Sequence, residues 1–217
     1  MYARRNAAGR APSPGDPRSW PVVWQLMAVN VLVYVLWQMP GLRWLMVDHF
    51  MVSAESVFGL RLWTLITSAF SQYSSGHLFS NLLGIYFFGT TIEAVRGRRA
   101  VLELYLGGAL AAGVAHVLGN LALGSAVPAL GASGAVMALG GAFAAQWPNR
   151  KFLIYFLVPM PAWVMITLYA ALDLTGMLGG VSDGIAHMAH LGGLAFGLLW
   201  VWRKGWWPRA RRASTSW

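Results

Sequence analysis

One serine and two histidines, Ser133, His190 and His77, are of the types that acyl-transfer chemistry needs. Ser133 lies in the small-residue sequence Gly131-Ala132-Ser133-Gly134, and His190 follows later in the chain. A histidine can take the proton of a serine hydroxyl, which makes that serine a nucleophile toward a carbonyl carbon. His77 and Asn81 add side-chain N–H groups of the kind that stabilise a developing oxyanion. These residue types predict nucleophilic hydrolysis if the fold brings them to one place.

The composition places these polar residues in a membrane. Of the 217 residues, 57% are hydrophobic and only 11% are charged, whereas a soluble domain carries about 25% charged residues. Several apolar stretches reach the roughly 20 residues that a helix needs to cross a bilayer. The 25 glycines suit close packing between transmembrane helices. The absence of cysteine excludes disulfides, thiolate metal sites and cysteine nucleophiles.

We expect an all-α polytopic membrane protein with six transmembrane helices. Apolar runs and helix breakers predict helices over residues 22–39, 77–95, 100–122, 133–147, 152–173 and 185–202. The fourth helix is short, because Pro128 and Gly131 stop any helix that enters from the outside, so Ser133 lies at its start. A helix start offers free N–H groups and a partial positive charge, which suit an oxyanion.

The basic residues predict the orientation of the chain. We expect a disordered basic N-terminal tail over 1–20, the membrane domain over 21–203 and a basic C-terminal tail over 204–217. With six helices, 14 of the 16 Lys and Arg residues fall on the inner side, as the positive-inside rule requires. They are therefore membrane anchors, and we expect no nucleic-acid partner.

This orientation predicts a multi-pass protein with both termini in the cytoplasm, and we expect the membrane to be a prokaryotic plasma membrane. The alternative for the Arg-rich start is an organelle transit peptide.

Counting along the helices places three polar residues at one depth. Asn81, Ser133 and His190 each lie about 20–25 Å from the next basic residue on the inner side, at 1.5 Å per residue. Since the hydrocarbon core is about 30 Å thick, they share one layer some way below the outer surface. His116 and His187 fall at a similar depth, so depth alone does not choose among the histidines.

The two histidines of the last helix differ in the face that they occupy. Gly193 and Gly197 form a stripe of small residues, which lets membrane helices approach closely. At 100° per residue this stripe lies closer to His190 than to His187. Small residues of the fourth helix could meet it: Gly134, Ala138 and Gly141. This packing predicts that His190 faces Ser133 and that His187 points aside.

Other polar groups are interpreted as structural. His116 has no partner that the sequence identifies. Asp173 and Asp183 are expected at a solvated interface near the outer end of the fifth helix. Glu93 is expected to hold the loop between the second and third helices.

Three motifs together resemble the rhomboid family of intramembrane proteases. They are His77-Leu-Phe-Ser-Asn81, Gly131-Ala-Ser133-Gly134 and Ala189-His190-Leu-Gly-Gly193-Leu-Ala-Phe-Gly197. Their order and spacing match over about residues 60–200. Leu62-Trp63-Thr64-Leu65-Ile66-Thr67 also resembles the first outer loop of that family.

The resemblance implies a six-helix core around a water-filled cavity that opens to the outside. It implies a serine-type endopeptidase with a Ser–His dyad and no acid, in which Ser133 is the nucleophile and His190 the base. His77 and Asn81 would bind the oxyanion together with Ser133 and Ala132. No cofactor is implied. The implied substrates are membrane-spanning proteins, cut in or near their transmembrane segments.

One residue departs from the family pattern, and two other functions compete with proteolysis. Many members have an aromatic residue one turn after the serine, against which the histidine packs, whereas this chain has Met137. A thioether contacts an imidazole less rigidly. One competing function is a binding protein of the same fold that captures membrane clients without cutting them. The other is a transporter or channel, which the lack of internal repeats disfavours.

Reporter domains fused to the two termini should both be found on the inner side of the membrane, because six spans return the chain to the side where it started. The measurement is a protease-protection or reporter-activity assay on each fusion. A C-terminal reporter on the outer side would imply an odd number of spans, and the common depth of Asn81, Ser133 and His190 would no longer follow.

Overall fold

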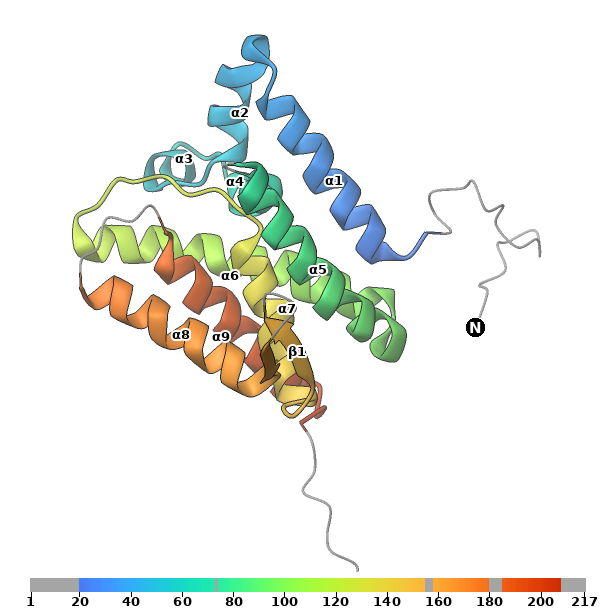
Figure 1. Ribbon diagram of the computed structural model, residues 1–217. Helices are drawn as coiled ribbons and strands as arrows, with labels where there is room; N and C mark the ends of the chain where they lie inside the picture. The colour runs from blue at the N-terminus through green and yellow to red at the C-terminus, as the bar shows by residue number, and fades with distance from the viewer. Residues whose placement is uncertain (1–19, 73, 155–157, 180–184, 208–217) are drawn as a thin grey trace, which may run out of the picture.

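The computed structural model describes residues 20–72, 74–154, 158–179 and 185–207 (Figure 1). Most of the two expected tails, 1–20 and 204–217, and Asp183 lie outside these residues. The longer helices are α1 (Val22–Trp37), α5 (Ser75–Arg96), α6 (Arg98–Leu123), α7 (Ser133–Gln146), α8 (Ala162–Leu178) and α9 (His187–Arg203). Between α1 and α5 the chain forms α2 (Arg43–Phe50), α3 (Ala54–Phe58), α4 (Thr64–Thr67) and two 3-10 turns, η2 (Pro40–Leu42) and η3 (Ser68–Phe70).

The described residues contain two helices, α5 and α6, that are long and apolar enough to cross a membrane. A third span results if α1 and the helical segment Pro40–Phe50 count as one, although the chain bends there by 97°. The apolar helix α8 is shorter. The protein is thus a helical membrane protein, and six spans remain a prediction.

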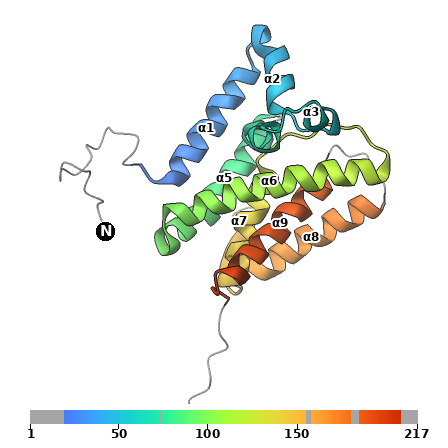
Figure 2. The same cartoon turned by 180° about the vertical axis from the view of Figure 1, so that it is seen from behind.

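Helix α7 forms the centre of the bundle. Twelve of its 14 residues are buried, and it packs against α5, α6, α8 and α9. Figure 1 shows α7 between α5 and α9, with α6 behind, and the opposite view in Figure 2 shows α6 crossing in front of α7 and α9. Residues at the start of α7 are therefore held by neighbours on several sides.

The backbones of α7 and α9 touch at two glycines of α9. A Cβ atom at Gly193 would lie 2.0 Å from the carbonyl oxygen of Gly134, and one at Gly197 would lie 2.1 Å from that of Ala138. Both distances are far shorter than any contact that a real Cβ makes, so glycine is required at both positions. The predicted packing of the Gly193/Gly197 stripe on the fourth helix is confirmed.

The segment before α8 differs from the sequence prediction. Instead of a helix from residue 152, an antiparallel hairpin of β1 (Lys151–Ile154) and β2 (Val158–Pro161) precedes α8. Pro159 and Pro161 lack the N–H group that a helix interior needs, and each disfavours helical backbone in the residue before it. Helix α8 therefore begins only after Pro161 and extends to Leu178, so Asp173 lies inside it rather than at its end.

Glu93 holds a different element from the one predicted. Its carboxylate accepts hydrogen bonds from the backbone N–H groups of Val22 (2.7 Å) and Val23 (3.1 Å). A carboxylate is favourable at the positive end of a helix. Glu93 thus fixes the start of α1 against the inner end of α5.

Gly193→Ala should separate α7 from α9 and lower the free energy of unfolding by about 1–3 kcal/mol, as overpacking of a tight core does. Thermal unfolding in detergent measures the effect. Gly41→Ala is the matched control, since a Cβ there meets no atom within 4 Å. Equal stability of the two variants would show that the close α7–α9 contact is not tight.

Candidate active site

Ser133 and His190 form a hydrogen-bonded pair between α7 and α9. The Oγ atom of Ser133 lies 2.7 Å from Nε2 of His190. Ser133 is the first residue of α7, and His190 lies in the first turn of α9. The distance is that of a nucleophile and a general base. The structure brings together the two residues that the sequence predicted as the reacting pair.

The segment that leads into Ser133 is tied down by backbone hydrogen bonds. Val52 and Ala129 exchange two N–H···O bonds of 2.9 and 2.8 Å, and the N–H of Gly131 donates to the carbonyl of Ser68 at 2.9 Å. Gly131 has φ of +139°, a conformation that L side chains rarely adopt. The glycine is needed for the turn that delivers Ser133 to the helix start.

His116 supports the same segment from α6. Its Nε2 atom lies 2.9 Å from the carbonyl oxygen of Val127, and the amide of Asn120 donates to that oxygen at 2.7 Å. His116 is 5% exposed. The structural interpretation of His116 agrees with these contacts, which also supply the partner that the sequence did not identify.

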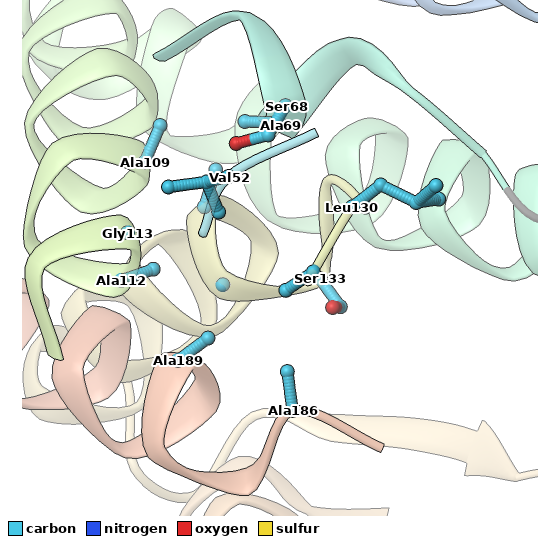
Figure 3. A pocket seen from close by; sticks show the side chains of 14 residues that line it. Val52, Ser68, Ala69, Ala109, Ala112, Gly113, Leu130, Ser133, Ala186 and Ala189 are labelled. Atoms are coloured by element: carbon cyan, nitrogen blue, oxygen red, sulfur yellow. The ribbon is translucent and has the colours of Figure 1, made fainter. Parts of the chain in front are cut away.

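A pocket lined mainly by small residues lies beside Ser133 (Figure 3). In Figure 3, Ala186 and Ala189 lie across from Ser133, and Leu130 lies just before it in the chain. Gly113 and neighbouring alanines of α6, with Val52 and Ser68, close another side. These small side chains leave a cavity of about 30 Å³ beside Ser133, which is the space of a water molecule.

His77 lies beside the same turn. A Cβ atom placed at Gly131 would lie 2.8 Å from Cε1 of His77 and 3.5 Å from Oγ of Ser133. The imidazole and the hydroxyl thus border one small volume next to Gly131. Ala132, buried completely, precedes Ser133 as the N-cap of α7. This arrangement is compatible with the predicted oxyanion site.

Asn81 is buried but bonded to another partner. Its amide donates to Oε1 of Gln72 at 2.8 Å, and the amide of Gln72 donates to Oδ1 of Asn30 at 2.7 Å. Asn30 in turn donates to the hydroxyl of Tyr105 at 2.9 Å. The structure brings Asn81 to Gln72, and among the described residues Asn81 and Ser133 form no hydrogen bond with each other. An asparagine amide has two N–H groups, so one remains for a further acceptor.

Asp173 is the functional candidate that the sequence reasoning misplaced. It is only 5% exposed, and its Oδ1 atom lies 2.9 Å from Nδ1 of His190 and 2.9 Å from Nδ1 of His187. The expected solvated interface is therefore wrong, because the longer α8 places Asp173 against α9. The geometry also differs from the implied dyad without an acid. An acidic residue within an apolar helix was the available signal.

Met137 is buried among the core residues, at 8% exposure. The ring of His190 is instead held at both nitrogens, by Ser133 and by Asp173.

Among the residues that the structure describes, no group of three or more His, Cys, Asp or Glu side chains is arranged to hold a metal ion.

These features define a class of protein. In this helical membrane protein a hydrogen-bonded Ser–His pair lies at the start of a buried helix, and such a pair can act as nucleophile and base. Residues 59–207 match the family model described as the Rhomboid domain. Since the match covers more than half of the chain, the protein belongs to the rhomboid family. Membership supports a function of the intramembrane-protease type.

Three relatives show the extent of the similarity. RHOMBOID-like protein 12, mitochondrial, of Arabidopsis thaliana is 35% identical over 201 residues, covering 85% of this chain and 59% of the relative. Rhomboid protein 1, mitochondrial, of Saccharomyces cerevisiae is 32% identical, covering 83% and 52%. Presenilin-associated rhomboid-like protein, mitochondrial, of Homo sapiens is 31% identical, covering 81% and 46%. The chain spans about half the length of these relatives.

The comparison corrects the predicted location. All three relatives are named as mitochondrial proteins, which contradicts the expected prokaryotic plasma membrane. The positive-inside rule reports only which side of a membrane carries the basic loops. It does not distinguish one membrane from another, and this explains the error.

Ser133 should react with a fluorophosphonate, because His190 Nε2 is placed to accept its proton. Gel fluorescence or intact-protein mass spectrometry measures the label. Ser133→Ala should lose labelling, whereas Ser68→Ala, at a serine that lines the same pocket, should keep it. Labelling that persists in Ser133→Ala would place the reactive nucleophile elsewhere.

Proposed function

We propose that this protein is an intramembrane serine endopeptidase that hydrolyses peptide bonds in or near the transmembrane segments of other membrane proteins. The observation that carries the proposal is the 2.7 Å contact between Ser133 Oγ and His190 Nε2 at the start of the buried helix α7. Membership of the rhomboid family supports the same reaction.

The reaction begins with the transfer of the Ser133 hydroxyl proton to Nε2 of His190, while Oγ attacks the carbonyl carbon. The tetrahedral oxyanion accepts hydrogen bonds from the Ser133 N–H and from the side chains of Asn81 and His77, with Ala132 forming the adjoining backbone. His190 then gives its proton to the leaving amine as the C–N bond breaks. Water, deprotonated by His190, then attacks the acyl ester, and His190 returns the proton to Ser133 Oγ as the Oγ–acyl bond breaks.

The predicted depth of the site and the shape of its pocket support this substrate class. Inside a regular helix, each peptide carbonyl accepts a hydrogen bond from a backbone N–H of the same helix. The substrate helix must therefore unwind locally before the peptide bond can reach Ser133. The small residues around the pocket, among them Gly113, Ala186 and Ala189, suit small side chains next to the cut bond.

The membrane that holds this protein is proposed from its relatives. The three relatives described above are named as mitochondrial, which supports a mitochondrial membrane.

Purified protein in liposomes should cut members of a panel of single-span proteins, with the products identified by mass spectrometry. Ser133→Ala and His190→Ala should each give no product, since the nucleophile or its base is lost. Asp48→Asn, an exposed change outside the site, serves as the control. Substrates that bind without being cut by the unaltered protein would make it a membrane-client binding protein. Cutting that survives in Ser133→Ala would overturn the proposed mechanism.

Asn81→Ala should lower kcat by roughly 10²–10³-fold, the loss typical of a side-chain oxyanion donor. KM should change little, because the interaction forms mainly in the transition state. Gln72→Ala is the informative partner variant: it removes the acceptor that now holds the Asn81 amide and should cost less. An unchanged kcat in Asn81→Ala would assign Asn81 to the buried network alone.

A further inference from the structure

Asp173 presents a buried carboxylate that the proposed reaction does not use. Its side chain is 7% exposed, and its Oδ1 atom lies 2.9 Å from Nδ1 of both His190 and His187. Burying a carboxylate in an apolar bundle costs free energy unless hydrogen-bond donors compensate it. Two imidazole donors on a single oxygen are such a compensation. The contact to His190 is on the ring nitrogen opposite to the one that meets Ser133.

We propose that Asp173 is the positioning acid of a Ser133–His190–Asp173 triad, and that His187 holds the same carboxylate oxygen, Oδ1, with a second hydrogen bond. The inference rests on the proposed endopeptidase function and adds a third residue to its machinery. Asp173 acts through His190 and touches neither Ser133 nor the substrate.

The first argument concerns the tautomer of His190. A neutral imidazole carries one N–H and one free lone pair. A carboxylate can only accept, so Nδ1 of His190 must carry the proton that it donates to Asp173. Nε2 is then left with the lone pair that faces Ser133 at 2.7 Å. The Asp173 carboxylate thereby selects the form of the ring that can act as a base.

The second argument concerns charge. When His190 takes the Ser133 proton, the ring becomes an imidazolium cation inside a region of low dielectric. A carboxylate within hydrogen-bond distance forms a charge-assisted bond to this cation, which is stronger than a neutral one. Within the described part of the chain, His190 meets Asp173 from α8 and Ser133 from α7, with His187 and His77 nearby, and Asp173 is the acidic group among these four. The negative charge of Asp173 therefore stabilises the state in which chemistry occurs.

The third argument concerns the fit of His187 against α8. A Cβ atom at Gly176, three residues after Asp173, would lie only 2.3 Å from Nε2 of His187. The absence of a side chain at Gly176 makes room for the His187 ring beside the helix that carries Asp173. Its Nδ1–H can then donate to the same oxygen that accepts from His190. The Asp173 carboxylate of α8 thus forms hydrogen bonds with two histidines of α9.

A graded series of variants in liposomes tests the charge and the hydrogen bond separately. Asp173→Asn can keep an oxygen toward the two histidines and loses only the charge, so kcat should fall at least about tenfold. Asp173→Ala loses both and should lower kcat by roughly 10²–10⁴-fold. KM should stay the same within about threefold, because Asp173 does not contact the substrate. Fluorophosphonate labelling should slow in proportion to kcat.

The matched control is Asp48→Asn, which makes the same change at an exposed carboxylate beside Arg61 and should leave kcat unchanged. His187→Ala keeps the contact between Asp173 and His190, and should retain at least about a tenth of the activity, the loss of one charge-assisted hydrogen bond. A merely structural Asp173 would change thermal stability and leave the kcat of the folded fraction intact.

A spectroscopic arm remains informative even where a variant folds poorly. The chain has five histidines, so ¹⁵N-histidine spectra are simple, and His190→Ala assigns the ring. His190 should be the Nδ1–H tautomer in the unaltered protein and should lose that preference in Asp173→Ala.

Full activity of folded Asp173→Ala, or a His190 ring protonated at Nε2 in the unaltered protein, would overturn the triad. Failure of the unaltered protein to cut substrates or to be labelled would overturn the endopeptidase function instead. The ¹⁵N spectrum would still show whether Asp173 accepts a hydrogen bond from Nδ1 of His190.

Discussion

The contact between the backbones of α7 and α9 determines where the reacting side chains lie. Gly193 lies against the carbonyl oxygen of Gly134 with no room for a Cβ atom, and Gly197 repeats this contact one turn further along. His190 is three residues before Gly193, and Ser133 directly precedes Gly134. Because both helices are rigid, fixing the glycine contacts also fixes the distance between Oγ and Nε2. The spacing of glycines in α9 is therefore part of the active site's geometry.

Polar groups in the apolar interior are stabilised in connected sets. Asn81, Gln72, Asn30 and Tyr105 form one chain of hydrogen bonds, which ends at the carbonyl of Ala69. It links α5 and α1 to α6 and to the segment before α5. Each bond satisfies a group that would be costly to bury alone. The same principle holds around Asp173, where two histidines satisfy one carboxylate oxygen. Polar residues here order the helices and the site together.

Much of the site could be predicted from the sequence, because its signals are local. The breakers Pro128 and Gly131 predicted a helix that starts at Ser133, and the face of the glycine stripe separated His190 from His187. Hydropathy alone placed the fifth helix too early, since it gave no weight to Pro159 and Pro161. The contact of Asp173 with His190 joins two helices whose relative rotation no local pattern contains. The hydrogen bond from Asn81 to Gln72 was also missed, because Gln72 lies in the irregular segment before α5, whose path no local pattern contains.

The central claim is that Ser133 attacks a carbonyl whose oxyanion is held at the start of α7. The most direct measurement is an experimental structure of the protein after reaction with a fluorophosphonate, whose tetrahedral phosphorus imitates the intermediate. The account predicts a bond from Ser133 Oγ to phosphorus, with a phosphoryl oxygen within hydrogen-bond distance of the Ser133 N–H and of Asn81 or His77. A phosphoryl oxygen that points away from all three donors, or an adduct on another residue, would contradict it.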